Sequence, residues 1–372
     1  MIDTQNGKVL SILHEASDIQ ELVVEVQGEQ SKAINYPGFT GFASVGDEVS
    51  LNTTAVNLKL GTGGYHFIVH ILNKRQLPSE EVRGHIMKLR YTPLQLATGS
   101  CEEQGSPYHK LFCEQRSLEG MPVLVAELHS MLPIAVTYIK KINPALRVAY
   151  IMTDKAGLPI SFSRHVRILK ETGGLVGTIT IGQAFGGDLE AVNIYTGLLA
   201  AKYILRADLV IVAMGPGIVG TGTTLGFSGM EQVEHLHAAY SLRGMPILVP
   251  RVGSADPRPR HQGISHHTLT VLEHTLVPAY IPILDEVVKD HPLKMGQSIW
   301  VIGSQHQLSG LESLLAQYPE TITTMGRTVE EDPLFFYSVG LAADFASYIT
   351  PRVSDPCGIE DLVRSWRDST IL

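Results

Sequence analysis

The first 72 residues of the chain alternate short apolar segments with turn residues. The segments are rich in Val, Ile, Leu and Thr, and they lie at 8–13, 21–26, 31–36, 48–56 and 65–72. Glycine, proline and aspartate fall between them, as is typical of turns that join strands. Five strands at this spacing predict a small β-barrel, because closing a sheet on itself removes its exposed edges.

After residue 106 the pattern changes to apolar runs that alternate with helical segments. The runs predict strands at 122–126, 147–153, 175–181, 207–214, 246–251, 279–284, 298–303 and 321–325. Between most of them, apolar positions recur at three- and four-residue spacing, which indicates amphipathic helices. Since the runs lack strict alternation with polar residues, we expect strands that are buried on both faces of a parallel sheet.

This alternation of strand and helix predicts a doubly wound, mostly parallel, Rossmann-like α/β domain. A closed (β/α)₈ barrel is the alternative, although the unequal lengths of the connections favour the open sheet. We therefore divide the chain into a small β-barrel domain at 1–72, a linker at 73–106 and an α/β domain at 107–372.

Composition and charge narrow the classes of function. Charged residues make up 18% of the chain and hydrophobic residues 44%, which allows a large core. A net charge of −8 argues against a nucleic-acid partner, because such proteins need a basic face to displace counterions. No leader-like start and no long apolar run occur, so we expect a cytoplasmic protein with no membrane partner.

The cysteines predict no disulfide framework, because Cys101, Cys113 and Cys357 have no paired spacing. Cys113 is expected in the core.

The most informative segment is the glycine- and threonine-rich turn that follows the strand at 207–214. Its letters GPGIVG match the dinucleotide fingerprint G-x-G-x-x-G, but residues 220–229 are too rich in Gly and Thr to begin a helix. The next strand also ends in Arg251 instead of the acidic residue that binds a ribose. No Gly-Lys-Ser/Thr follows, which excludes a P-loop, and the acidic pair of a phosphoribosyl-pyrophosphate loop is replaced by Met214 and Gly215. The sequence therefore names no cofactor.

Glycines let consecutive backbone N–H groups converge, and threonine hydroxyls add further donors, so this turn can form an anion-binding nest. The alternative is a long structural connection whose glycines only permit close packing. The candidate anion-binding residues of the turn are Gly215, Gly217, Gly220, Thr221, Gly222, Thr223 and Thr224.

A second candidate follows the strand at 246–251. Arg251, Arg258, Arg260 and His261 lie within eleven residues of each other, in a chain that is otherwise acidic. The planar guanidinium group of arginine suits phosphate or carboxylate. Because consecutive strands of a doubly wound sheet usually lie side by side, we expect this loop to meet the glycine turn and bind an anionic small molecule with it. The alternative is an arginine-rich surface loop.

Two adjacent histidines begin the next predicted helix. Ser265 is expected to be its N-cap, which places His266 and His267 at the positive end of the helix, where the pKa of an imidazole falls. Neutral imidazoles can accept a proton or bind a metal ion. No H-E-x-x-H or other spaced ligand set occurs, so no metal site is assigned from the sequence.

The candidate general acid/base residues are His129, Asp154 and His266. His129 and Asp154 follow the strands at 122–126 and 147–153, where α/β proteins place their chemistry, and they should share a crevice with the glycine turn. Asp188 is interpreted as the N-cap of a helix.

Three stretches together resemble an uncharacterised bacterial family that is known only as a conserved domain of unknown function. They are MGPGIVGTGTTLGFSG, ADPRPRHQGISHHT and TMGRTVEEDPLFF. The resemblance extends over most of the chain and implies one complete protein. It implies no activity.

The sequence therefore predicts an enzyme that acts on a phosphorylated or nucleotide-like small metabolite. The alternatives are a non-catalytic ligand sensor or assembly protein, and a structural homodimer. An enzyme requires a proton-transfer group within hydrogen-bond reach of the anion, and a sensor does not.

Overall fold

The computed structural model describes residues 2–60, 63–74, 84–288, 296–352 and 359–368. The chain forms two compact units, Met1–Thr98 and Gly99–Leu372. Cys357 and part of the predicted linker lie outside the described residues.

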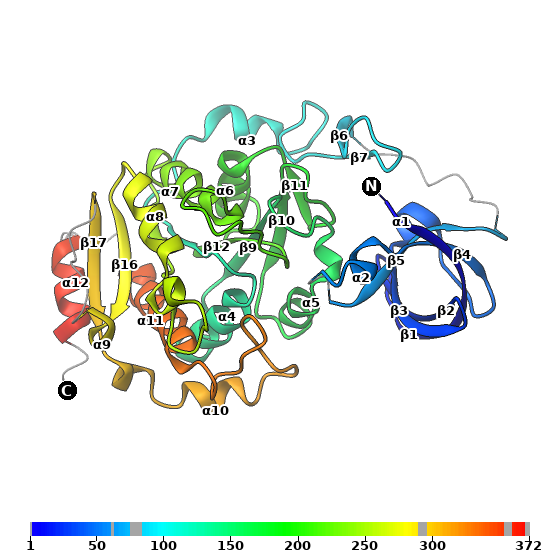
Figure 1. Cartoon of the computed structure of the whole chain (residues 1–372). Helices are drawn as coiled ribbons and strands as arrows, with labels where there is room; N and C mark the ends of the chain where they lie inside the picture. Colours follow the sequence, from blue (N-terminus) through cyan, green and yellow to red (C-terminus); the bar gives the residue numbers. More distant parts are fainter. Residues whose placement is uncertain (1, 61–62, 75–83, 289–295, 353–358, 369–372) are drawn as a thin grey trace. The chain divides into compact units, whose positions relative to one another are not determined.

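The N-terminal unit contains the predicted small barrel (Figure 1). Its described strands are β1 (Thr4–Glu15), β2 (Gln20–Val26), β3 (Glu29–Asn35), β4 (Glu48–Asn52) and β5 (Tyr65–Ile71). They close in the order β1-β2-β3-β5-β4, and β3 pairs with β5 in parallel while the other pairs are antiparallel. Alternate apolar side chains such as Leu22, Val24 and Leu51 fill the interior.

The other elements of this unit are short. The helical turns are α1 (Pro37–Thr40) and α2 (Thr54–Asn57), and a separate hairpin is formed by β6 (Ile86–Lys88) and β7 (Leu96–Thr98). The predicted strand at 48–56 was too long, because the Asn52 side chain accepts a hydrogen bond from the Thr54 backbone N–H and the chain turns into α2.

In the described part of the second unit, one sheet of eight parallel strands confirms the predicted α/β fold. The strands are β8 (Pro122–Val125), β9 (Val148–Thr153), β10 (Gly177–Ile181), β11 (Leu189–Ala191), β12 (Leu209–Met214), β13 (Met245–Leu248), β16 (Ala279–Leu284) and β17 (Ser298–Gly303). Their order is β11-β10-β9-β12-β8-β13-β16-β17, and the sheet is open. The closed (β/α)₈ alternative is therefore wrong.

Helices cover both faces of this sheet, which explains why its strands are apolar throughout (Figure 1). One face carries α6 (Ile194–Tyr203), α7 (Glu231–Ser241) and α8 (His266–His274), and the other carries α4 (Met131–Ile142), α5 (Arg164–Glu171) and α11 (Pro333–Ile349). The remaining α-helices are α3 (His109–Glu114), α9 (Asp285–Val288), α10 (Leu311–Leu315) and α12 (Ile359–Asp368). No helix within the described ranges is long and apolar enough to cross a membrane.

Several local predictions were wrong. Residues 321–325 form no strand and contribute only a bridge between Thr324 and Arg327. Asp188 is not an N-cap, because its carboxylate accepts hydrogen bonds from the Thr178 N–H and hydroxyl, and α6 is capped by Asn193. Cys113 is exposed on α3.

The order of the central strands determines which of the loops that follow them lie close together. β8 lies between β12 and β13, so the predicted strands at 207–214 and 246–251 are not direct neighbours as expected. The chain moves outward from β8 to β9, β10 and β11, returns to β12, and then continues on the other side of β8. Such a reversal is where open α/β sheets form their ligand crevice.

We predict that Phe336→Ala lowers the free energy of unfolding of this unit by about 3–5 kcal/mol, because the ring is fully buried in α11. Leu276→Ala, at a side chain that is 77% exposed, is the control and should change it by less than about 0.5 kcal/mol. Both tryptophans, Trp300 and Trp366, lie in this unit, so their fluorescence during urea unfolding reports on it alone. Equal losses in the two variants would contradict the packing described.

Candidate functional site

Three connections meet at the carboxyl ends of β12, β8 and β13. Glu127 follows β8, a hairpin at 219–228 follows β12, and a loop at 251–267 follows β13. A Cβ atom built on Gly222 would lie 3.9 Å from Arg260 Nη2, and one on Gly229 would lie 3.0 Å from Glu127 Cγ. The two loops that the sequence predicted to meet therefore do so, although β8 separates their strands.

The glycine turn begins as a tightly packed segment and continues as a hairpin. A Cβ atom on Gly215 would lie 2.4 Å from the Gly157 carbonyl oxygen, so a side chain does not fit there. Gly217 has a φ of +107°, which also favours glycine. The hairpin then forms through a bridge between Gly220 and Phe227.

The threonines of the turn hold the tip of this hairpin together. The Thr221 hydroxyl donates to the Gly226 carbonyl oxygen at 2.9 Å, and Thr223 Oγ1 accepts from the Gly226 N–H at 3.1 Å. Thr224 is exposed beside them. Two of the three threonine hydroxyls predicted to bind an anion are therefore engaged within the hairpin itself.

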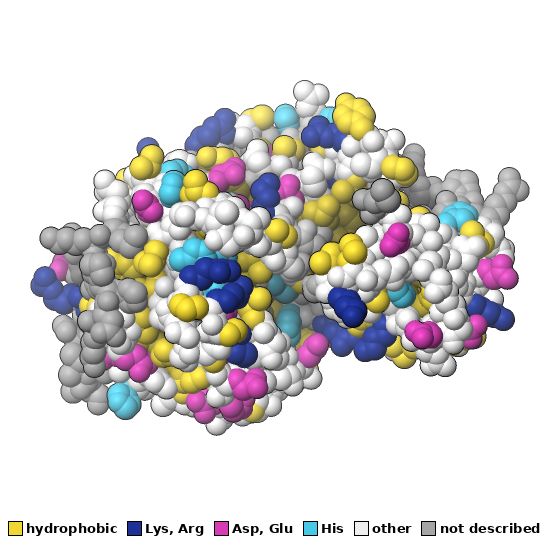
Figure 2. Space-filling view, viewed as in Figure 1, with side chains coloured by type: hydrophobic (Ala, Val, Ile, Leu, Met, Phe, Trp, Pro, Cys, Tyr) yellow, Lys and Arg dark blue, Asp and Glu magenta, His cyan; other side chains and the backbone are white. Residues whose placement is uncertain are grey.

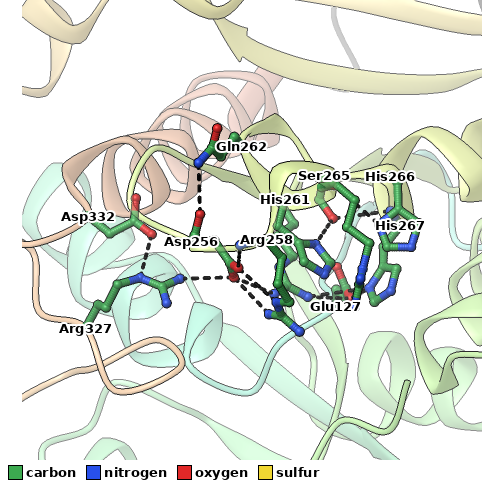
Figure 3. A network of polar contacts seen from close by, with 12 residues as sticks. Glu127, Asp256, Arg258, His261, Gln262, Ser265, His266, His267, Arg327 and Asp332 are labelled. Carbon is green, nitrogen blue, oxygen red and sulfur yellow. Dashed lines mark hydrogen bonds and ion pairs between the residues drawn. The ribbon is translucent and has the colours of Figure 1, made fainter. Parts of the chain in front are cut away.

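The loop at 251–267 is closed at its base and presents histidines at its end. β14 (Val252–Gly253) pairs with β15 (Gly263–Ile264), and the Ser265 N–H donates to the Arg251 carbonyl oxygen at 2.8 Å. Ser265 is the N-cap of α8, as predicted, since its hydroxyl accepts from the His267 N–H. This arrangement places His266 and His267 next to His261 (Figure 3).

The three histidines are each held at one ring nitrogen. His261 Nδ1 lies 2.8 Å from Ser265 Oγ, and His266 Nδ1 lies 3.3 Å from the Arg260 carbonyl oxygen. His267 Nδ1 lies 2.5 Å from Glu127 Oε1. Each ring also offers one possible ligand atom, and these three atoms lie within 4.8 Å of one another. Within the described residues, these are the side chains that could hold a metal ion.

Burial lowers the pKa of two imidazoles of this cluster, which favours their neutral form. Burial lowers the pKa of His261 to about 3, and the nearby charges of Arg251 and Arg258 lower it further. Burial and the adjacent His267 also lower the pKa of His266. The ring of Phe227 stacks on His267, with 3.7 Å between ring centres. Burial is the largest cause of the lowered pKa of His266, whereas the cause expected from the sequence was the helix N-terminus.

Arginines and carboxylates form a buried network beside the histidines (Figure 3). Arg251 Nη1 lies 3.2 Å from Glu127 Oε1, and Arg258 donates from Nε and Nη2 to the two oxygens of Asp256. Arg327 contacts Asp256 at 3.5 Å. The hydrogen bond from Arg258 holds the pKa of Asp256 far below its usual range.

This network uses the charges of two arginines that the sequence predicted to bind an anion. Arg251 is buried and is paired with Glu127, and Arg258 is paired with Asp256. Arg260 is different, because its side chain is exposed and forms no ion pair with any described residue. On the face seen in Figure 2, basic and histidine side chains lie side by side.

Sequence reasoning missed the carboxylates of this network. Glu127 lies two residues after the end of β8, and that position near a strand end was the available signal. Asp332 accepts hydrogen bonds from the Ser254 N–H and from Arg327, whose Nε lies 3.0 Å from Asp332 Oδ2. Both Arg327 and Asp332 belong to a stretch that carried the family resemblance, but nothing in it indicated their partners.

His129 lies beside the start of the glycine turn and Asp154 lies against residues 182–183, and the polar atoms of both are engaged. His129 Nε2 lies 2.5 Å from Ser163 Oγ, its Nδ1 lies 3.3 Å from the Met214 carbonyl oxygen, and burial lowers its pKa to about 4. Asp154 accepts from the Gln183 N–H at 3.1 Å and pairs with Lys155 at 3.1 Å. Of the predicted acid/base residues, His266 alone joins the histidine cluster.

Glu231, at the start of α7, is a further titratable group that the sequence did not single out. Burial raises its pKa to about 7, with a contribution from the nearby charge of Asp154. The Thr153 hydroxyl at the end of β9 donates to Glu231 Oε1 at 2.5 Å. This carboxyl group therefore titrates near neutral pH at the same edge of the sheet.

Comparison with known proteins identifies one family. The model of a family described as "Protein of unknown function (DUF3866)" matches residues 32–343. No curated protein matches the chain.

We predict that Glu127→Ala lowers the free energy of unfolding by about 3–5 kcal/mol, because it leaves Arg251 and His267 without their buried carboxylate. Glu114→Ala breaks the exposed pair with Lys110 and should cost less than about 0.5 kcal/mol. Urea unfolding followed by tryptophan fluorescence compares the two. A loss for Glu127→Ala no larger than that for Glu114→Ala would argue against a stabilising role of the buried pair.

We also predict a pH-dependent effect of Glu231→Gln. The raised pKa means that the protonated group stabilises the fold at low pH and that this contribution is lost as pH rises through about 7. The variant should therefore gain roughly 2–3 kcal/mol over the parent at pH 8, and this gain should disappear near pH 4. Glu234→Gln, at an exposed position of the same helix, is the control. A gain that does not vary with pH would contradict the raised pKa.

Proposed function

Because the chain belongs to the DUF3866 family, whose description names no activity, we propose a function from the site itself. The protein is an enzyme that acts on an anionic small molecule, of the phosphorylated or nucleotide-like class. The observation that carries this proposal is the meeting of the glycine-rich hairpin with Arg260 beside three histidines.

Arg260 is the residue that binds the anion in this proposal. Its guanidinium is exposed and unpaired among the described residues, and it lies against Gly222 at the tip of the hairpin. A phosphate or carboxylate bound between Arg260 and Gly222 would contact the positive charge of the guanidinium on one side and the backbone of the glycine turn on the other. In an acidic chain, a cation without a carboxylate partner at a strand-end crevice is suited to a ligand.

The other two arginines have supporting roles. Asp256 occupies Nε and Nη2 of Arg258, so Nη1 remains as the donor that this half-exposed side chain can offer to the anion. Arg251 is a positioning residue, because its buried guanidinium joins Glu127 to the loop after β13.

The histidine cluster favours an enzyme over a sensor. A sensor needs only groups that bind the anion, whereas this site also contains neutral imidazoles next to Arg260. His266 Nε2 is buried and has no hydrogen-bond partner in the described part of the chain. No described residue therefore uses the lone pair at this position.

We predict that Arg260→Ala weakens binding of phosphorylated ligands at least ten-fold, because a charge-assisted contact contributes about 1.5–3 kcal/mol. The measurement is the ligand-induced rise in melting temperature of the full chain with inorganic phosphate, AMP and glucose 6-phosphate. Lys110→Ala removes one exposed positive charge elsewhere and should leave that rise unchanged. If Arg260→Ala responds to all three ligands as the parent does, or if the parent responds to none, the proposed anion site is wrong.

A further inference from the structure

We propose that His261, His266 and His267 together bind one divalent transition-metal ion of the zinc class through their Nε2 atoms. This inference goes beyond the anion site and does not depend on which anion binds there. It rests on the hydrogen bonds that hold the three rings, on the charges around them and on the space beside the cluster that no side chain fills.

The first observation is that each ring is fixed through Nδ1. The partners are a hydroxyl, a backbone carbonyl and a carboxylate: Ser265 Oγ, the Arg260 oxygen and Glu127 Oε1. Histidines that bind metal ions are held in this way, because the bond at one nitrogen fixes the tautomer and directs the lone pair of the other. In this cluster the remaining nitrogen is Nε2 in every case.

The second observation is that the described part of the chain leaves these Nε2 atoms without a hydrogen-bond partner. No described residue forms a hydrogen bond with Nε2 of His261, His266 or His267, and that of His266 is fully buried. A buried polar atom without a partner destabilises a fold by about 1–3 kcal/mol. His266 Nε2 is such an atom, and the three rings each offer one ligand atom within 4.8 Å of the others, so a cation bound between them would satisfy it.

The electrostatic environment is compatible with a cation. Arg251 and the N-terminus of α8 both disfavour positive charge at this place, but Glu127 supplies a buried negative charge in direct contact with His267. Glu127 Oε1 contacts both His267 Nδ1 and Arg251 Nη1. A carboxylate at one nitrogen of an imidazole increases the basicity of the other nitrogen.

The donor set selects the class of metal. Imidazole nitrogens suit Zn²⁺, Co²⁺, Ni²⁺ and Cu²⁺, whereas Mg²⁺ and Ca²⁺ prefer oxygen ligands. A tetrahedral site with metal–nitrogen distances of about 2.1 Å needs its nitrogens roughly 3.4 Å apart. The ligand atoms lie within 4.8 Å of one another, so they must approach each other by at most about 1.4 Å. His266 has the freedom to do so, because it is only half-buried and its Nδ1 contact is long at 3.3 Å.

Three protein ligands leave a fourth position for water or for an anion, which is the pattern of catalytic and not of structural zinc sites. The hairpin lies on the side of His267 Nε2, where a Cβ atom on Gly220 would be 4.0 Å away. Because residue 220 is glycine, no side chain occupies this space. A ligand in the fourth position would thus lie between the histidines and the hairpin that approaches Arg260.

The test uses the full chain, stripped with a chelator and dialysed against Zn²⁺ or Co²⁺, with bound metal measured by mass spectrometry and by the visible absorption of Co²⁺. We expect about one equivalent of either metal, and no comparable binding of Mg²⁺. Single changes His261→Ala, His266→Ala and His267→Ala should each weaken binding by about 100-fold or more. Glu127→Gln should weaken it 10- to 100-fold.

His274→Ala is the matched control, since His274 lies on the same helix outside the cluster. His266→Gln, at the half-buried position, serves if the other variants fail to fold, as checked by circular dichroism. Absence of saturable Zn²⁺ binding by the folded parent, equal binding by His266→Gln, or equal binding of Mg²⁺ would overturn the proposal. Arg260→Ala should keep the full affinity for metal, so the metal site and the anion site succeed or fail separately.

Discussion

Glu127 is a carboxylate buried at the carboxyl end of the central strand β8, and the arrangement of the site depends on how its charge is compensated. Transfer of a single ionised carboxyl group into a protein interior costs several kcal/mol, so it is tolerated only with partners. Arg251 and His267 are those partners, and both come from the connection after β13. The connection after β12 also approaches this side chain, since a Cβ atom on Gly229 would lie 3.0 Å from Glu127 Cγ. The buried charge therefore holds the loop after β13, and the side chain that carries the charge lies against the connection after β12.

Charge compensation by neighbouring side chains also determines the structure of the arginine-rich loop, where most of the charges are paired within the protein itself. Three arginines, Arg251, Arg258 and Arg327, face the three carboxylates of Glu127, Asp256 and Asp332. Arg260 lies outside this balanced set. The arginines that are close together in the sequence thus have two different roles. Those paired with carboxylates stabilise the loop, and the unpaired one is available to a ligand. Only the positions of the carboxylates distinguish these roles.

Much of the fold could be predicted from the sequence, because the period of apolar residues reports on local structure and burial. The barrel strands, the parallel sheet and the Ser265 cap all follow from such local signals. The insertion of β8 between β12 and β13 could not be predicted, since strand order is set by contacts between distant segments. The histidine cluster escaped notice for a related reason. His261 precedes α8 and reaches the other two through the fold of the loop, so no helical spacing indicates it.

The long separation between Glu127 and its partners also has a consequence for how the chain folds. Arg251 is 124 residues further along the chain, and His267 is 140 residues further. Until both are present, the end of β8 holds a carboxylate that favours water over a packed environment. We therefore expect the carboxyl end of β8 to stay hydrated until the large loops to Arg251 and His267 have closed. Burial of this end of the central strand and assembly of the site would then occur together.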